Sequence, residues 1–198
     1  MKKLKKKELL AYFDVYRSAF PDWQGEPDAQ ISRTHGPLKQ QIGMEALLTG
    51  AYRLSSAVEL LLNMPKPRHI LTCHLDIRHR DIYPREHLAK WQSAVKAMEE
   101  QFVPPPRRPL EVAETLRLAE LEVERDNIVN MHYSACLAAL NASHGNLTRA
   151  QYWCDRLKQQ STSRGRELPE WAIEKVNFGA ELSQAIRAKK EQDFLKLT

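Results

Sequence analysis

The stretch of sequence that decides the predicted fold is HILTCHLDIRHRDI, residues 69–82. From residue 71 to residue 77 the odd-numbered positions are apolar, and the even-numbered positions between them are polar or charged. The apolar set is Leu71, Cys73, Leu75 and Ile77, and the polar set is Thr72, His74, Asp76, Arg78 and Arg80. Because successive side chains of a strand point to opposite faces, this alternation predicts a β-strand with an apolar face and a charged face.

A single strand leaves its backbone donors and acceptors unpaired, so the strand at 69–82 needs partner strands. Residues 29–62 are the only stretch that can supply them, and Gly36-Pro37 and Thr49-Gly50 would provide the turns. Side chains of one parity are mostly apolar: Leu38, Gln40, Ile42, Met44 and Ala46, then Tyr52, Leu54, Val58, Leu60 and Leu62. We therefore predict a small antiparallel sheet. The good helix formers in 44–62 leave an all-α fold as the alternative.

Two amphipathic helices are predicted to flank this sheet. The first covers residues 8–20 and ends at Pro21, because the residue before a proline avoids the α region. The second opens at Tyr83-Pro84, where proline suits the first helical turn. Its apolar stripe is Leu88, Trp91, Val95, Met98 and Phe102. These helices would cover the apolar side of the sheet and make residues 1–103 an α+β unit behind a flexible lysine-rich tail.

The rest of the chain is predicted to be helical and to follow a proline-rich connector. Residues 104–109, PPPRRP, are stiff and favour a spacer over a docking ligand for an aromatic groove. Residues 110–198 form the helical part. Its predicted helices are Leu110–Glu124, Ile128–Ala142, Leu147–Gln160 and a last one that begins near Pro169, and Asp126-Asn127 marks either a break or a polar turn.

One segment of the helical part resembles a known repeat. The residues that carry the resemblance are Leu137, Ala138, Ala139, Leu140, Gly145, Ala150, Trp153 and Leu157. This pattern over about 131–159 resembles a tetratricopeptide helix hairpin, in which small residues pack the helices and glycine makes the turn. No second copy occurs at the expected period. The resemblance implies a helical hairpin layer suited to protein binding, without a superhelical groove.

Charge and composition narrow the functional classes. The chain has 198 residues, 42% of them hydrophobic, and a net charge of +5. Five lysines at positions 2, 3, 5, 6 and 7 account for that whole excess, so a basic surface for nucleic acid is not favoured. No run approaches the roughly 18 apolar residues of a membrane span, and charged residues interrupt any secretory apolar region. The sequence therefore predicts a cytoplasmic protein, and Cys73, Cys136 and Cys154 are expected to be reduced and mostly buried.

No established catalytic motif occurs in the sequence. There is no phosphate-binding glycine loop, dinucleotide fingerprint, nucleophile elbow or Cys-x-x-Cys pair. His74, Asp76, His79 and Asp81 are metal-ligating types, but the predicted register puts the first two on one face and the last two on the other. We therefore predict no metal site and no cofactor. Acid–base catalysis by His74, oriented by Asp76, is conceivable but lacks a nucleophile or a phosphate cradle.

These observations favour a non-enzymatic protein–protein interaction protein, such as an adaptor, an inhibitor or an immunity-type partner. The predicted interaction surface is the charged strand face with its aromatic neighbour: His74, Asp76, Arg78, Arg80 and Tyr83. Arginine and aromatic residues are favoured at binding hot spots, and such a row suits a partner with an acidic surface. Two alternatives stay open: a hydrolase or nuclease that uses the His74/Asp76/Arg78 face, and a nucleic-acid-binding protein.

Overall fold

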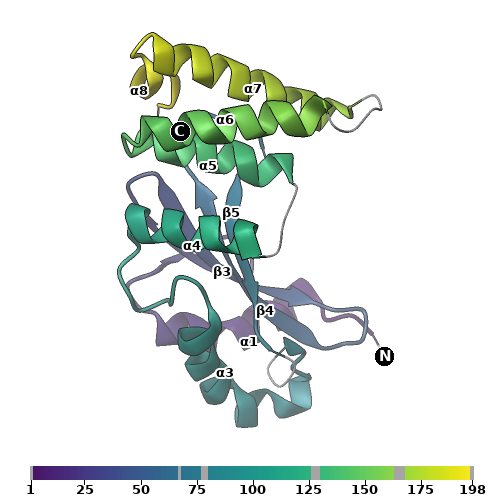
Figure 1. The fold of residues 1–198 in the computed structure, drawn as a ribbon. Helices are drawn as coiled ribbons and strands as arrows, with labels where there is room; N and C mark the ends of the chain where they lie inside the picture. The colour runs from purple at the N-terminus through teal and green to yellow at the C-terminus, as the bar shows by residue number, and fades with distance from the viewer. Residues whose placement is uncertain (1, 67, 77–79, 126–129, 163–167, 197–198) are drawn as a thin grey trace. The chain divides into compact units, whose positions relative to one another are not determined.

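The structure, a computed structural model, describes residues 2–66, 68–76, 80–125, 130–162 and 168–196. Its centre is a five-stranded antiparallel sheet whose strands lie in sequence order (Figure 1). The strands are β1 (Gln24–Gly25), β2 (Gln30–His35), β3 (Leu38–Ala46), β4 (Tyr52–Leu60) and β5 (His69–His74). Together with the helices described below, this sheet confirms the predicted α+β class.

The partner strands predicted within 29–62 are present as β2, β3 and β4. Even-numbered side chains of β3 and β4 are buried, and odd-numbered side chains are exposed or half-buried. Both predicted turns place glycine in the left-handed region, with φ of 55° at Gly36 and 80° at Gly50. Glycine adopts this conformation without the steric cost that a Cβ would bring. The period-two pattern therefore outweighed the helix propensity of 44–62.

The strand predicted over 69–82 is shorter in the structure. Leu71 and Leu75 are buried and Thr72 and His74 are exposed, so the predicted alternation holds for this part. However, β5 ends at His74, and residues 77–79 lie outside the described part of the chain. Ile82 is fully buried and makes an isolated antiparallel bridge with Tyr52. A continuous strand would have placed Ile82 on the charged face, so the prediction was wrong beyond β5.

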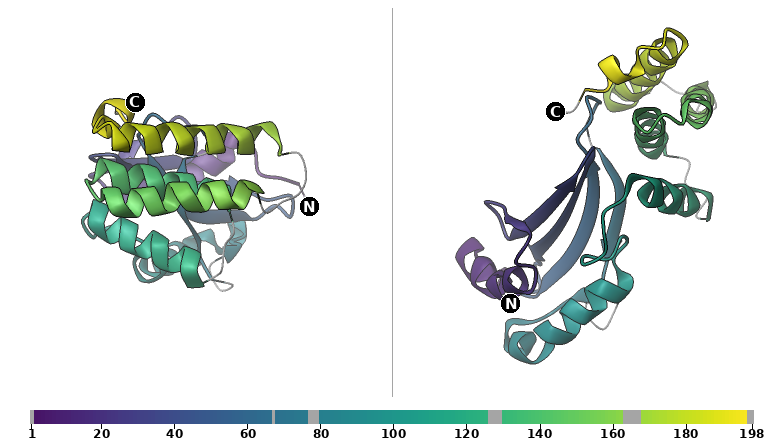
Figure 2. Two further views of the ribbon diagram at one scale, coloured as in Figure 1. Left: turned by 45° about the horizontal axis from the view of Figure 1, so that its top comes forward. Right: turned by 90° about the vertical axis from the view of Figure 1, so that its left-hand side faces the viewer.

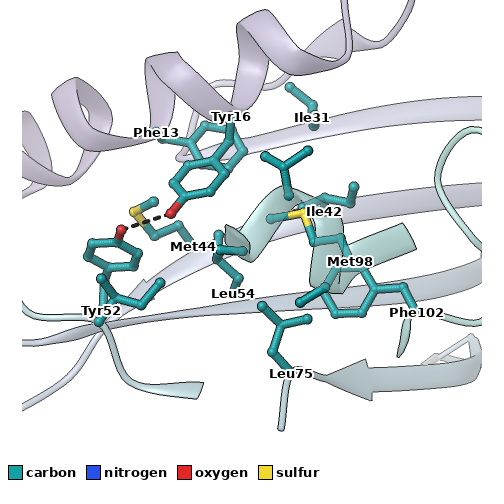
Figure 3. Packing of buried hydrophobic residues seen from close by; sticks show 14 of the residues in the cluster. Phe13, Tyr16, Ile31, Ile42, Met44, Tyr52, Leu54, Leu75, Met98 and Phe102 are labelled. Atoms are coloured by element: carbon teal, nitrogen blue, oxygen red, sulfur yellow. Dashed lines mark hydrogen bonds between the residues drawn. The ribbon is translucent and has the colours of Figure 1, made fainter. Parts of the chain in front are cut away.

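Two helices and a 3₁₀ turn pack against one face of the sheet. They are α1 (Lys6–Ala19), η1 (Pro84–Glu86) and α3 (His87–Gln101). Figure 3 shows Phe13 from α1, Ile42 from the sheet and Met98 from α3 pointing into one core. The predicted stripe of α3 holds at Val95, Met98 and Phe102 but is wrong at Leu88, which is 84% exposed. His87 is buried in its place.

The proline-rich segment packs onto the sheet instead of spanning free solvent. Pro104 and Pro106 are buried. Gln40, a buried polar residue of β3, donates its amide N–H to the Pro104 carbonyl at 2.6 Å and accepts from the Arg33 guanidinium at 2.6 Å. These bonds satisfy a polar group that would otherwise be costly to bury on the core face.

The C-terminal part contains α4 (Val112–Arg125), α5 (Met131–Ser143), α6 (Leu147–Thr162), α7 (Glu170–Arg187) and α8 (Glu191–Phe194). Helices α5, α6 and α7 run side by side (Figure 2). Gly145 joins α5 to α6 with φ of 82°, and Ala150, Trp153 and Leu157 are fully buried. Helices α5 and α6 are therefore present as two packed helices, and the likeness of residues 131–159 to a tetratricopeptide hairpin stays a prediction. The expected break at Asp126-Asn127 lies outside the described residues.

Contacts divide the chain into two compact units, and each unit combines segments that are separated in sequence. Unit 1 comprises Met1–His35, Lys39–Val58 and Leu71–Leu110, and unit 2 comprises Gly36–Leu38, Glu59–Ile70 and Glu111–Thr198. The sequence-based division instead placed the whole sheet in 1–103. The tip of the β4–β5 hairpin belongs with the C-terminal helices. Among the described helices, none has both the length and the apolar character required to cross a membrane.

Candidate functional site

The residues of the predicted interaction surface do not share one strand face. His74 ends β5 with an exposed side chain, and Asp76 is exposed in the segment that follows. The backbone N–H of Asp76 donates to Gln101 Oε1 at 2.8 Å. Arg80 is exposed but lies outside any strand, and Arg78 lies outside the described residues. The described residues of this surface therefore lie at the end of β5 and in the segment that follows it, and they do not form a row on one strand face.

His74, Asp76 and Arg80 are absent from the walls of the four hollows described in this structure. Within the described part of the chain, no three metal-ligating side chains come together. An enzyme that used this face would need its side chains to converge on a bound substrate. The described geometry brings no such group together there.

Tyr83, the remaining predicted residue, lies in the wall of an open hollow of about 530 Å³ in unit 1. We call it the Tyr83 hollow, and it is lined by Lys2, Leu4, Gly50, Tyr83, Pro84 and Arg85. Three distant segments meet here: the chain before α1, the turn between β3 and β4, and the start of η1. Its wall is mostly apolar, with two cationic side chains.

Local sequence explains why η1 begins where it does. Pro84 occupies the first helical turn, where a missing N–H costs nothing and the fixed φ is already suitable. Glu86 Oε2 accepts the backbone N–H of Tyr83 at 3.3 Å and pairs with Lys90 Nζ at 3.2 Å. The hydrogen bond from Lys90, together with that from Tyr83, lowers the pKa of Glu86. Glu86, the carboxylate next to Arg85 in sequence, is therefore already bound to the Tyr83 N–H and to Lys90.

The two cations of the Tyr83 hollow form no salt bridge within the described residues, although the charge of Arg85 helps to lower the pKa of the neighbouring Glu86. Within the described residues, neither Lys2 nor Arg85 has an acidic group within 4.0 Å. Asp81, close in sequence, pairs instead with Arg53 at 2.9 Å. The Arg85 guanidinium lies 5.7 Å from the centre of the Tyr83 ring. An aromatic ring and two available cations therefore border an apolar depression.

Two strongly exposed leucines flank the segments that build this hollow. Leu48 is 83% exposed and precedes Gly50 by two residues, and Leu88 is 84% exposed and follows Arg85 by three. Single exposed apolar side chains are ordinary on protein surfaces. Neither leucine lines the hollow itself, but both add exposed apolar area to the segments that do.

The N-terminal tail has more structure than its lysines suggest. Helix α1 begins at Lys6, although we expected it to begin near Glu8. Glu8 accepts the backbone N–H of Lys5 at 2.8 Å, which satisfies a free helix-end donor. Leu4 is half-buried against the core of unit 1. The signal in the sequence was a leucine among lysines, followed by an acidic residue at capping distance.

Two buried clusters of polar side chains have the residue types of catalytic groups, but burial keeps their side chains in the neutral form. In unit 1, the Tyr16 and Tyr52 hydroxyls lie 2.9 Å apart, and Tyr52 Oη lies 2.8 Å from His87 Nδ1 (Figure 3 shows the tyrosine pair). Burial raises the pKa of Tyr16 to about 12 and also raises that of Tyr52, so both phenols stay neutral. No described hollow reaches this chain of hydrogen bonds, which is therefore a structural feature of the core.

In unit 2, Cys136 Sγ lies 3.8 Å from His132 Nδ1, as a nucleophile and a base would. Burial raises the pKa of the Cys136 thiol to about 12, and burial lowers the pKa of His132 to about 4. A nucleophilic cysteine requires the thiolate, which burial disfavours here. His132 Nε2 lies 2.7 Å from the His69 carbonyl, so it carries a proton and donates it. The pair joins α5 to β5.

Comparison with known proteins gives no relative from which a function could be transferred. The chain matches no protein-family model, no curated protein and no solved structure.

Proposed function

We propose that this chain is a non-enzymatic protein-binding module that holds an acidic segment of a partner protein at the Tyr83 hollow. The observation that carries the proposal is the pair of cations, Lys2 and Arg85, which border an apolar hollow and have no acidic group within 4.0 Å in the described chain. An adaptor, inhibitor or immunity-type role would use such a surface in the same way.

The hollow specifies the chemistry of its partner. An apolar side chain of the partner would contact Leu4, Tyr83 and Pro84, where removal of water favours binding. Acidic side chains on either side would face Lys2 and Arg85. Complementary charge speeds encounter and disfavours basic partners, while the apolar and aromatic contacts provide most of the affinity.

Tyr83 and Arg85 are residue types that recur at binding hot spots. The tyrosine offers a rigid, partly apolar surface, and the arginine offers up to five hydrogen-bond donors in a planar group. Arg85 is exposed, whereas Tyr83 is half-buried and lies at the N-cap position of η1. The anchor is therefore preorganised, which reduces the entropy lost on binding.

The test uses defined peptides and the full-length protein. A twelve-residue peptide with one central leucine between aspartates and glutamates is titrated into isotope-labelled protein, and amide shifts locate the site. Matched controls replace the leucine with serine, or the acidic residues with lysine. We expect saturable binding of the first peptide only, with shifts at Gly50, Tyr83 and Arg85, and weaker binding at high salt.

Two variants decide whether the cations are responsible. Arg85→Glu and Lys2→Glu should each weaken binding about tenfold, the loss typical of a charged contact. Lys96→Glu is the matched control because Lys96 is 80% exposed on α3 and is not part of the hollow. If Arg85→Glu binds the acidic peptide as tightly as the wild type does, the proposal is wrong. A single-stranded oligonucleotide that binds more tightly than the peptide at the same residues would replace it with nucleic-acid binding.

A further inference from the structure

A second hollow of unit 1 lies where α1 ends and β2 begins. Its volume is about 450 Å³, which is within the range of small-molecule sites. It is lined by Ala19, Phe20, Pro21, Asp22, Trp23, Arg33, Pro106 and Arg107. We call it the Arg33 hollow. No residue of the Tyr83 hollow contributes to it, so its argument is independent of the proposed function.

Arg33 is held rigidly by neutral acceptors. Its Nε and Nη2 atoms donate to Gln40 Oε1 at 2.9 and 2.6 Å, and Nη2 also donates to the Pro105 carbonyl at 3.2 Å. Its guanidinium lies 5.0 Å from the centre of the Trp23 ring. Burial lowers the pKa of Arg33, and the more distant Glu99 carboxylate opposes that change. Arginine remains charged at neutral pH under these conditions.

Arg107 provides a second cation in the same wall. Its Nη2 donates to the Ala19 carbonyl at 3.3 Å, at the end of α1, and its guanidinium lies 5.3 Å from the centre of the Phe20 ring. Its Nε lies 3.8 Å from Glu99 Oε1, which is a loose contact for an ion pair. Asp22 is the single carboxylate in the wall. The wall itself therefore presents two guanidinium groups and one carboxylate, while Glu99, which also accepts the backbone N–H of Arg107 at 3.2 Å, is not one of the lining residues.

From this arrangement we propose that the Arg33 hollow binds a small organic oxyanion, a carboxylate or a phosphate monoester, attached to an apolar group. Guanidinium groups bind both oxyanions through the charged N–H donors of their planar fork. In Arg33 the Nη1 donors serve this role, because Nε and Nη2 already bind Gln40 and Pro105. Half-buried Arg33 forms no salt bridge among the described residues, and the Glu99 carboxylate acts on it only from a longer distance, so an anion in the hollow would supply a closer countercharge. The rings of Phe20 and Trp23, with Pro21 and Pro106, form the apolar side of the site.

The test uses three compounds of similar size in calorimetric titrations of the full-length protein: phenyl phosphate, benzoate and benzyl alcohol. We expect saturable binding of at least one anion and none of the neutral alcohol. Phosphate alone, carboxylate alone, or both would each support the site and identify its preferred anion. No saturable binding of either anion up to about 10 mM, or equal binding of the alcohol, would overturn the proposal.

Variants assign the binding to the two arginines. Arg107→Gln should weaken binding about tenfold or more, because a charged hydrogen bond is lost. Arg33→Lys keeps the charge and loses the fork, so it should also weaken binding. Arg108→Gln is the matched control, since Arg108 is exposed next to Arg107 and does not line the hollow. Circular dichroism checks that each variant is folded. Unchanged affinity in both Arg107→Gln and Arg33→Lys would overturn the site.

Discussion

At the scale of single residues, this protein keeps several polar side chains inside its units by pairing each with another polar group. Gln40, Tyr16, Tyr52 and His87 are buried in unit 1 and have hydrogen-bond partners within the same unit. A buried polar group costs little when it is paired and considerably more when a partner is removed. Single substitutions in these hydrogen-bond networks should therefore lower the free energy of unfolding by a measurable amount.

The first prediction concerns the Tyr16 hydroxyl. Tyr16→Phe removes its hydrogen bond to Tyr52 and should lower the free energy of unfolding by about 1 kcal/mol, because His87 still pairs with Tyr52. Urea denaturation measures the change. Tyr12→Phe is the control: Tyr12 is half-buried beside the same rings, and its loss of a hydroxyl should have an effect of under about 0.5 kcal/mol. Equal losses in the two variants would show that the hydrogen bond is not responsible.

The second prediction concerns acidification. Burial, with a contribution from the charge of Lys175, lowers the folded-state pKa of His132 to about 4, below its ordinary value of 6.5. The unfolded chain then binds a proton more readily than the folded chain, so stability decreases as pH falls from about 6.5 toward 4. His132→Gln keeps an N–H donor and cannot titrate. Denaturation at pH 7 and pH 4.5 should show a smaller loss in the variant, and identical losses would contradict the assignment.

At the scale of secondary-structure elements, one carboxylate joins three helices of unit 2. Glu120 Oε1 on α4 accepts from Trp153 Nε1 at 2.7 Å, Arg149 Nε at 2.8 Å and Asn141 Nδ2 at 3.3 Å. Burial alone would raise the pKa of Glu120, but the hydrogen bonds from Arg149 and Trp153 outweigh it and leave the pKa lowered. The ionised carboxylate is therefore the form that holds α4, α5 and α6 together.

The third prediction follows from that junction. Glu120→Gln keeps the shape and removes the charge, so it should lower the free energy of unfolding by about 1–2 kcal/mol. Trp153 fluorescence and circular dichroism in urea report the transition. Glu114→Gln on the same helix is the control, because its pair with Arg117 is exposed and should contribute little to stability. A loss in Glu114→Gln as large as that in Glu120→Gln would rule out a special role for the junction.

At the scale of the whole molecule, the two compact units are not successive pieces of chain. Unit 2 takes its C-terminal helices together with the β4–β5 hairpin tip, residues 59–70. Lys175 donates to the Pro65 carbonyl, the His69 carbonyl accepts from His132, and the Asn63 N–H donates to the Lys196 carbonyl at 3.0 Å. Dividing the chain at residues 104–109 would therefore separate the C-terminal helices from the hairpin tip that belongs to the same unit.

The fourth prediction tests this division. A fragment of residues 111–198 lacks the Pro65 and His69 carbonyls, which accept from Lys175 and His132 in the intact protein. We expect a lower urea midpoint and a broader transition than in the intact protein, both measured by circular dichroism at the helical signal. A fragment that unfolds with the intact protein's midpoint would show that the helices form an independent domain, as the sequence division at 104–109 implied.

Sequence periodicity determined the local elements of this protein and the side chains that face its core. The alternation in β3 and β4, the left-handed glycines Gly36 and Gly50, and the hairpin turn at Gly145 could be read from the sequence because each depends on neighbours a few residues away. The exposed Leu88 could not, since its burial depends on whether another element covers it.

Only the tertiary structure decided which side chains meet. The Tyr83 hollow brings Lys2, Gly50 and Arg85 together, and the Arg33 hollow brings Trp23 and Arg107 together, across long intervals of sequence. Among the residues of the predicted surface that the structure describes, Tyr83 alone lines one of these hollows. A strand of fixed period was enough to predict a sheet, but a site requires several segments to converge. That convergence is set by how the elements pack and by which charges remain without a partner.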